Sequence, residues 1–181
     1  MKKDMLGKVA IVAAASGGLG KATAGKLAER GADVIICSRD RERIEATAEQ
    51  LQAATGREVI PVAADVSRRE QIEMVVEKAL AFAGRIHMLV TNAGGPPTGS
   101  FEDLDDEVWL SAHEANFLSV VRFVRAVLPA MKKQRSGSIV NIVSSSVKQP
   151  LPGLILSNAY RSAVVGLAKT LSTELAPYGI R

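Results

Sequence analysis

Five short apolar runs alternate with longer amphipathic segments along this chain of 181 residues. The apolar runs are rich in β-branched residues, are typical of buried strands, and lie at 9–12, 34–37, 59–62, 86–90 and 138–143. The amphipathic segments have helical spacing and lie at 20–30, 41–55, 68–83, 104–133 and 156–176. Strands and helices alternate without a hairpin signal, which favours parallel strands joined by right-handed crossovers. The sequence therefore predicts an α/β fold with a doubly wound parallel sheet between two helical layers.

Glycines and short polar residues indicate where the predicted helices begin and end. Gly31, Gly56 and Gly84 follow the first three helices, where a residue without Cβ adopts the left-handed backbone at least cost. Asp65 and Ser67 precede the third helix, and both residue types are favoured as N-caps. We therefore expect three glycine stops and a side-chain cap on helix 68–83.

Composition and charge exclude several classes of protein. With 47% hydrophobic and 23% charged residues, the chain is close to the globular average and is not predicted to be disordered. A single cysteine, Cys37, excludes a disulfide framework, and His87 and His113 without cysteine partners are interpreted as structural rather than as zinc ligands. The net charge of +4 comes from basic residues interleaved with acids, and aromatic residues are few. The sequence therefore predicts no nucleic-acid partner and no metal.

Two membrane-related interpretations are set aside. Lys2 and Lys3 before an apolar run resemble the start of a secretory signal, but Asp4 and Lys8 interrupt the approach. The apolar run then leads directly into a glycine-rich turn and a helical pattern. No stretch reaches the roughly eighteen apolar residues that a membrane span needs. We therefore expect a soluble, cytoplasmic protein without a membrane partner.

The loop after the first strand is rich in glycine and leads directly into a helix. In an open parallel sheet, ligands lie at the carboxyl ends of the strands, and glycines let the backbone approach a pyrophosphate at a helix N-terminus. The phosphate-binding loop GxxxxGK[ST] does not fit, because Ala15 and Ala22 stand at two of its required positions. A tight turn without a ligand is the alternative interpretation. The predicted dinucleotide-binding residues here are Ala14, Ser16, Gly17, Gly18, Leu19 and Gly20.

The end of the second strand favours NADP over NAD. An acidic residue there accepts from the ribose hydroxyls of NAD, whereas an arginine accommodates the 2′-phosphate of NADP. Ser38 and Arg39 occupy this position, which places a hydroxyl donor beside a permanent cation. Alternatively, Arg39 belongs to the solvated charge cluster 39–45, and NAD is the second possible cofactor. We therefore expect residues 1–181 to form a single NAD(P)-binding domain of the Rossmann type.

Further motifs resemble the short-chain dehydrogenase/reductase family, and this resemblance covers essentially the whole chain. Asp65-Val66 after the third strand resembles the family's adenine-contacting pair, and Asn92-Ala93-Gly94 resembles the NAG signature that lines the cofactor. Asn116 matches the asparagine that supports a water in the family's proton relay, and Ser144 matches the catalytic serine. The segment 176–181 is also close to what the family has in this place. Within the family, the chain is most similar to the branch of 3-oxoacyl-acyl-carrier-protein reductases.

The resemblance implies hydride transfer between a nicotinamide and a carbonyl or alcohol carbon, with a YxxxK motif in which the Lys lowers the pKa of the Tyr acid. Here the chain departs from the family. The family's spacing from Ser144 leads to Ser157 at the Tyr position and to Arg161 at the Lys position. A serine hydroxyl is far less acidic than a phenol, whereas Arg161 can still bind ribose hydroxyls and hold a positive charge. Tyr160 is a possible replacement for the acid, or it packs against a neighbouring helix.

The family continues with a further strand, a substrate-covering helix pair and a last strand, none of which follows Arg181. We therefore expect the sequence to be a fragment that lacks the family's last strands and leaves strand 138–143 as an open sheet edge. By the same resemblance, helices 104–133 and 156–176 are expected to form a homodimer or homotetramer.

Two functions follow from these patterns. The first is an NADP-dependent oxidoreductase that acts on a small-molecule carbonyl or hydroxyl substrate, such as a 3-oxoacyl thioester. The second is a protein that binds the dinucleotide without turnover, in a sensing or assembly role. Asn92-Ala93-Gly94, Asn116 and Ser144 favour the enzyme, whereas Ser157 and Arg161 favour the binding protein.

Overall fold

The computed structural model describes residues 4–181. Lys2 and Lys3, on which the secretory-signal alternative depended, lie outside the described residues. Within the described part of the chain, no helix is both long enough and apolar enough to cross a membrane.

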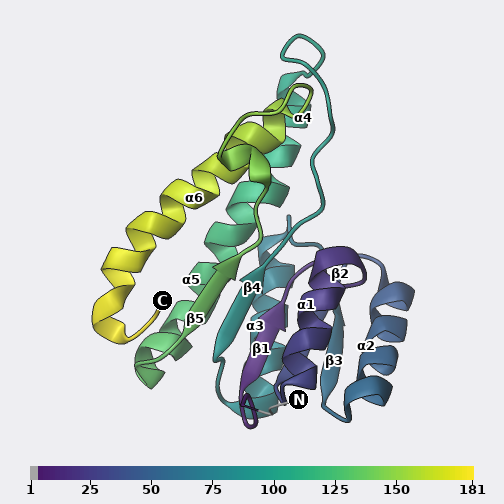
Figure 1. Cartoon of the computed structure of the whole chain (residues 1–181), viewed down its shortest axis with the longest axis vertical. Coiled ribbons are helices and arrows are strands. Elements are labelled where there is room, and N and C mark those ends of the chain that lie inside the picture. Colours follow the sequence, from purple (N-terminus) through teal and green to yellow (C-terminus); the bar gives the residue numbers. More distant parts are fainter. Residues whose placement is uncertain (1–3) are drawn as a thin grey trace.

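Five parallel strands form a single sheet in the order β3-β2-β1-β4-β5 (Figure 1). The chain moves outward from β1 to β3 and then returns to the other side of β1, so the strand order reverses between β1 and β4. Such a switch point is where ligands bind in open α/β sheets. The predicted fold class is therefore confirmed. The strands are β1 (Val9–Val12), β2 (Asp33–Ser38), β3 (Val59–Ala63), β4 (Met88–Thr91) and β5 (Ser138–Asn141).

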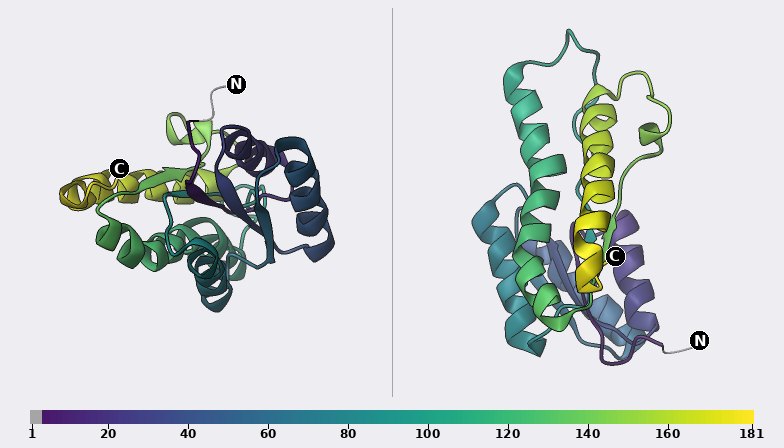
Figure 2. Two further views of the ribbon diagram at one scale, coloured as in Figure 1. Left: turned by 90° about the horizontal axis from the view of Figure 1, so that it is seen from below. Right: turned by 90° about the vertical axis from the view of Figure 1, so that its left-hand side faces the viewer.

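Helices cover both faces of this sheet and give three layers (Figure 2). The core on one face unites side chains of β1, α3, α5 and α6, with Phe123 and Met131 among its largest buried members. The core on the other face unites β1 and β2 with α1 and α2, including Ile36 and Ile44. The helices are α1 (Gly18–Glu29), α2 (Arg41–Thr55), α3 (Arg69–Ala83), α4 (Asp106–His113), α5 (Ser119–Gln134) and α6 (Ile155–Leu175), and the 3-10 helices are η2 (Ser145–Val147) and η3 (Ala176–Tyr178).

The prediction of a single helix over 104–133 is wrong in one respect. A five-residue π-helix, η1 (Glu114–Leu118), separates α4 from α5. A π turn holds one residue more than an α turn, and this small insertion leaves the helical spacing of apolar residues almost unchanged. The sequence pattern therefore indicates a continuous helix where the structure has two helices with a π turn between them.

The predicted helix ends agree with the structure at the glycines and disagree at one cap. Gly56 and Gly84 end α2 and α3 with left-handed φ values of 66° and 65°. The N-cap of α3 is Arg68, which makes no side-chain cap, so the cap predicted from Asp65 and Ser67 is wrong. Instead, Asp65 Oδ1 accepts from the backbone N–H and the hydroxyl of Ser67, because this short carboxylate folds back on its own loop.

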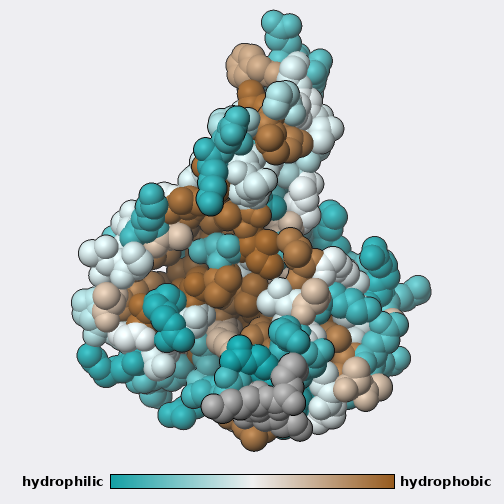
Figure 3. All heavy atoms as spheres, viewed as in Figure 1, coloured by the Kyte–Doolittle hydropathy of each residue, from teal (hydrophilic) through white to brown (hydrophobic). Residues whose placement is uncertain are grey.

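The outer edge of β5 is partly paired. The backbone of Arg181 accepts from Ile139 N–H at 2.8 Å and donates to Gly137 O at 3.1 Å, in a parallel arrangement. The expectation of a fully open edge is therefore corrected at the start of this strand. Further along, Val140 is 52% exposed, and Figure 3 shows apolar side chains gathered in the middle of the molecule on this side.

Candidate functional site

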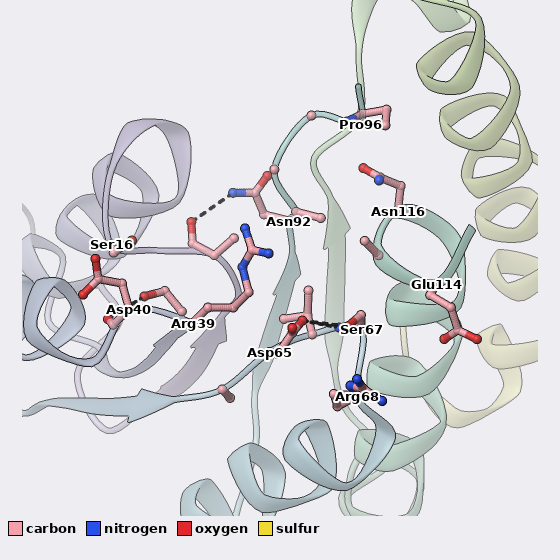
Figure 4. A pocket seen from close by; sticks show the side chains of 18 of the residues that line it. Ser16, Arg39, Asp40, Asp65, Ser67, Arg68, Asn92, Pro96, Glu114 and Asn116 are labelled. Atoms are coloured by element: carbon pink, nitrogen blue, oxygen red, sulfur yellow. Dashed lines mark hydrogen bonds between the residues drawn. The ribbon is translucent and has the colours of Figure 1, made fainter. Parts of the chain in front are cut away.

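A cavity of about 1140 Å³ opens at the carboxyl ends of the strands. The glycine loop and the ends of β2 and β3 form one side, and the loop after β4 together with the π-helix forms the other (Figure 4). The predicted cofactor-binding residues that line it are Ala14, Ser16, Gly17, Gly18, Leu19, Ser38, Arg39, Asp65, Val66, Asn92, Ala93 and Gly94. Gly20 and Arg161 belong to the same prediction but lie behind the lining. The ends of four strands far apart in sequence, β1 to β4, thus contribute to one space.

The glycine loop has the backbone that close approach of a ligand requires. Gly17 is the N-cap of α1, and Gly18 has a φ of +52°, which favours glycine. A Cβ on Gly20 would lie 2.3 Å from the carbonyl oxygen of Ala14, so this position holds the helix against the end of β1. The first backbone N–H groups of an α-helix have no partner within the helix. Those of α1 point toward the cavity end of the helix and suit a pyrophosphate.

Two charged residues, Arg39 and Asp40, follow directly after the end of β2. Asp40 Oδ1 accepts from the backbone N–H of Arg43 at 3.0 Å and caps α2. Ser38 Oγ donates to the carbonyl oxygen of Asp40 at 3.1 Å. Arg39 is exposed and points into the cavity (Figure 4). This end of the cavity therefore presents the guanidinium of Arg39 beside the Asp40 carboxylate, which already accepts one backbone N–H.

Arg43 and Arg68 also line the cavity, although the sequence interpretation did not select them. Arg43 stands one helical turn beyond Arg39, and that spacing was a usable signal. Arg68 comes from the loop after β3, and only strand order brings this loop beside β2. Of the arginines in the lining, Arg39 and Arg43 come from the end of β2 and the start of α2, whereas Arg68 lies beside Ser67 (Figure 4).

Asn92 and Asn116 stand on the other side of the cavity. Asn92 Nδ2 donates to Ala14 O at 3.3 Å and ties the loop after β4 to the glycine loop. Asn116 lies in the π-helix, is 2% exposed, and donates through Nδ2 to Ala112 O at 3.2 Å. Its Oδ1 has no partner within residues 4–181. A buried acceptor without a partner at a cavity wall is a place for an ordered water or a ligand donor.

Arg161 is a buried cation whose visible contacts are backbone oxygens. Its side chain lies on α6 and the residue is 7% exposed. Nη1 donates to Ile142 O at 3.1 Å and Nη2 donates to Ala93 O at 3.2 Å. No carboxylate in residues 4–181 pairs with it, and burial lowers the pKa of its guanidinium. Arg161 therefore joins the ends of β4 and β5.

Tyr160 contacts α4 rather than the cavity. Its hydroxyl donates to the backbone oxygen of Trp109 at 3.0 Å. Its ring lies edge-on to Trp109, at 5.8 Å between centroids, and 5.5 Å from the ring of His113. Burial raises the pKa of this phenol. The packing alternative considered for Tyr160 is the arrangement seen here, and the structure does not bring its hydroxyl to the cavity lining.

The two serines of the predicted catalytic set lie on neighbouring elements. Ser144 Oγ accepts from the backbone N–H of Ser146 at 3.1 Å, so its own hydroxyl proton stays available for donation. Ser157 lies in the first turn of α6, is half-buried, and makes no side-chain hydrogen bond within residues 4–181. The next residue, Asn158, exchanges hydrogen bonds with the backbone of Leu151 and fixes the loop between them.

Comparison with protein families and curated proteins shows which proteins this chain is similar to. The family model described as short chain dehydrogenase matches residues 8–181. Dehydrogenase/reductase SDR family member 4 of Homo sapiens is 36% identical over 181 residues, which cover 99% of this chain and 65% of that protein. The 3-oxoacyl acyl-carrier-protein reductase FabG of Thermotoga maritima is 35% identical over 175 residues, 97% of this chain and 71% of that protein. The chain thus spans about 65% of the length of the first of these relatives.

Solved structures with the same fold include proteins with different nicotinamide cofactors. L-sorbose reductase from Gluconobacter frateurii, complexed with NADPH and L-sorbose, matches with a TM-score of 0.96 and 31% identity over 100% of this chain and 69% of that one. NAD+-bound xylitol dehydrogenase matches with a TM-score of 0.93 and 28% identity over 98% of this chain and 68% of that one. Together with the family model over residues 8–181 and the glycine loop at the sheet's switch point, these likenesses confirm the predicted relationship: the chain belongs to the short chain dehydrogenase family.

Proposed function

We propose that this chain is the cofactor-binding part of a nicotinamide-dependent oxidoreductase that prefers NADP. It would act on a carbonyl or hydroxyl substrate, with 3-oxoacyl thioesters among the candidates. The observation that carries this proposal is the single cavity lined by the glycine loop, by Arg39 and Arg43 at the end of β2, and by Asn92 and Asn116. When bound, the nicotinamide supplies or accepts the hydride.

The residues present fit a dinucleotide. The cavity of about 1140 Å³ runs from the end of β2 to the π-helix, long enough to take two nucleotides joined by a pyrophosphate. A Cβ on Gly18 would meet nothing within 4 Å, so the backbone there is open to a close ligand. At the far side, Asn92 and Gly94 line the space near the start of the loop that Arg161 holds.

The preference for NADP rests on charge at the end of β2. Asp40 uses one carboxylate oxygen, Oδ1, to cap α2, and this acid stands beside Arg39 rather than in its place at the end of β2. Arg39 and Arg43 supply the guanidinium groups that suit a 2′-phosphate. Arg43 lies 4.0 Å from Asp40 Oδ2, which weakens its charge, whereas Arg39 makes no ion pair among the described residues. Arg39 is thus the leading contact.

This chain's own polar groups suggest how a proton reaches the substrate oxygen. The Ser144 hydroxyl accepts from Ser146 N–H and donates to the carbonyl oxygen of the substrate. We assign to Asn116, whose buried Oδ1 has no partner within residues 4–181, the water that delivers the proton. Arg161 holds a positive charge behind Ala93 that favours negative charge developing on the substrate oxygen. Ser157 is a weak acid, so we assign it to the orientation of that water.

A second candidate function is binding of the dinucleotide without turnover. Two observations favour it. The Tyr160 hydroxyl donates a hydrogen bond to Trp109 O, and two nitrogens of the Arg161 guanidinium donate to backbone oxygens. With these side chains engaged, neither the Tyr160 phenol nor the Arg161 guanidinium stands ready to transfer a proton to a substrate. A homo-oligomer through α4–α5 and α6 would suit either function.

The decisive experiment measures cofactor binding and turnover separately in the intact protein. NADPH fluorescence titration reports binding, and NADPH oxidation with a panel of 3-oxoacyl thioesters and small ketones reports activity. Binding of NADPH with turnover of at least one substrate supports the oxidoreductase. Binding of NADPH without turnover of any substrate would assign the second function, and absence of binding would overturn both.

A further inference from the structure

The cavity wall that carries Asn116 is a π turn with its own set of hydrogen bonds. π turns are rare, and they persist where surrounding contacts hold them. Ser119 Oγ donates to Ala115 O at 2.6 Å, and Asn116 Nδ2 donates to Ala112 O at 3.2 Å. Both donors are almost fully buried, at 3% and 2% exposure. These two side chains donate to one carbonyl just before the turn and to one within it. Asn116 Oδ1 has no partner among the described residues and lies on the cavity side of the turn (Figure 4).

Arg122 reaches back along the helix from α5 to the start of this turn. Its Nη1 donates to Glu114 Oε2, the carboxylate of the first π residue, and also to Ser67 O at 2.7 Å. The Arg122 side chain is 20% exposed and that of Glu114 is 41% exposed, so the arginine side of this ion pair is the better shielded from solvent. One guanidinium therefore connects the π turn with the loop after β3, and all three residues line the cavity.

The spacing of Glu114 and Arg122 matches a π turn better than a regular helix. Each residue of an α-helix turns about 100°, so residues eight apart are offset by about 80° around the axis. A π turn takes up one extra residue, and the pair then lies about as residues seven apart do, within roughly 20° of one face. A regular helix would separate the two charges and would rotate Asn116 relative to α5. The ion pair and the orientation of Asn116 thus depend on the same helical register.

We propose that Glu114 and Arg122 are a positioning pair that holds the π register and so aims Asn116 Oδ1 into the cavity. Through Ser67, Arg122 also connects the dinucleotide-binding loop after β3 with Asn116. Cofactor contact with that loop then stabilises the π turn at a distance. The cofactor part of this inference rests on the proposed function, whereas the positioning part depends on the described contacts alone.

The first test is hydrogen exchange of the intact protein measured by mass spectrometry. In the absence of cofactor, exchange across residues 114–119 is expected to rise several-fold in Arg122→Met and in Glu114→Gln. Glu114→Gln keeps the side-chain shape, so it serves if Arg122→Met does not fold. Arg125→Met removes an exposed arginine from the same helix and is the matched control. Unchanged exchange across 114–119 in both test variants would overturn the positioning pair, whatever the protein binds.

The second test adds NADPH to the same samples. In the wild type, NADPH is expected to slow exchange in the glycine loop 16–20 and across 114–119. In Arg122→Met the protection of 16–20 persists and that of 114–119 disappears, because the connection through Ser67 is lost. Equal protection of both segments in wild type and Arg122→Met would overturn the coupling. If NADPH slows exchange in neither segment of the wild type, the proposed cofactor is contradicted. The proposed coupling between cofactor and π turn would then be overturned as well.

Steady-state kinetics give the third measurement. In Arg122→Met, Asn116 is expected to lose its orientation. We therefore expect kcat to fall about tenfold and the substrate KM to stay within about twofold of the wild-type value. Arg122→Lys keeps the charge and is expected to recover part of kcat. A general loss of stability would lower kcat and protein yield together without rescue by Arg122→Lys, and that result would assign Arg122 a structural role only.

Discussion

The guanidinium of Arg161 and the carbonyl oxygen of Ala93 lie 3.2 Å apart, although 68 residues separate them in sequence. A second nitrogen of the same guanidinium binds Ile142 O at 3.1 Å. These two bonds fasten α6 to the loop after β4, which lines the cavity, and to the chain just beyond β5. Arg161, predicted from the sequence to stand at the family's Lys position, thus binds the backbone that shapes the site.

Arg161→Met should lower the free energy of unfolding by about 2 kcal/mol, because two buried carbonyl oxygens lose a charged donor. Relief of the buried charge offsets part of this loss. Urea unfolding of wild type, Arg161→Met and the exposed-site control Arg125→Met measures the effect. Equal midpoints for all three would show that the two bonds do not contribute to stability.

Tyr160→Phe should cost about 1 kcal/mol of stability and leave kcat within about twofold. The lost hydroxyl bonds Trp109 O, which would remain partly unsatisfied beside the aromatic rings. Thermal unfolding and NADPH oxidation are measured on the same preparations. A loss of kcat of about a hundredfold without a change in stability would instead make this phenol the acid.

Arg39→Gln should weaken NADPH binding about tenfold and leave NADH binding unchanged, because a 2′-phosphate loses its cation. Arg41→Gln is the matched control, since Arg41 is exposed on the same segment but pairs with Glu45 at 3.4 Å. Fluorescence titrations with both cofactors measure the effect. An equal loss for NADH and NADPH would contradict the assignment of Arg39 to the 2′-phosphate.

Gly20→Ala should destabilise the protein by about 2–3 kcal/mol and abolish dinucleotide binding. The added Cβ would meet the backbone oxygen of Ala14 at 2.3 Å, and neither backbone can move without shifting α1 from the sheet. Gly166→Ala in α6 is the control, because a Cβ there meets nothing within 4 Å. The control should gain up to about 1 kcal/mol from helix propensity. Calorimetry and NADPH titration distinguish the two variants.

His87 should make the protein less stable below neutral pH. Its Nδ1 accepts from Val9 N–H at 3.0 Å, and burial, followed by the charges of Lys8 and Arg85, lowers the pKa of this imidazole from 6.5. As pH falls through the unfolded-state value of about 6.5, the unfolded chain binds a proton that the folded chain does not, so stability falls. The loss levels off below the folded pKa. Unfolding of wild type and His87→Gln across pH 5–8 tests this, and an identical pH dependence in both would contradict it.

Cys37 illustrates how the fold decides reactivity. The sequence shows a lone thiol, whereas the structure buries it completely and thereby raises its pKa to about 12. The thiolate is the reactive form, and this residue therefore stays protonated in the folded protein.

The alternation of apolar strands and amphipathic helices was sufficient to predict the parallel sheet, because each signal is local and repeats. The glycine loop was also predictable, since Gly17, Gly18 and Gly20 stand together between a strand and a helix. Arg39 could be selected from one position at a strand end. These features depend on near neighbours in the chain.

Other parts of the site depend on residues brought together across the fold. The π turn at Asn116 adds one residue to a turn of a helix whose apolar spacing in the sequence is continuous. Arg122 donates a hydrogen bond to the backbone oxygen of Ser67, which lies 55 residues away in the sequence. The direction of Tyr160 was open in the sequence, and packing against Trp109 on α4 decided it. The pairing of Arg181 with the start of β5 likewise reduced the open edge expected there.

The sequence by itself determined the doubly wound sheet, the place of the dinucleotide loop and the family to which the chain belongs. Tertiary structure alone decided which polar groups stay free to act: among the described residues Asn116 Oδ1 has no partner, whereas Tyr160 and Arg161 are engaged. The physical reason is that strand and helix patterns follow from backbone geometry and local burial. A side chain's remaining hydrogen-bonding capacity depends on which distant backbone oxygens the fold brings within about 3 Å of it.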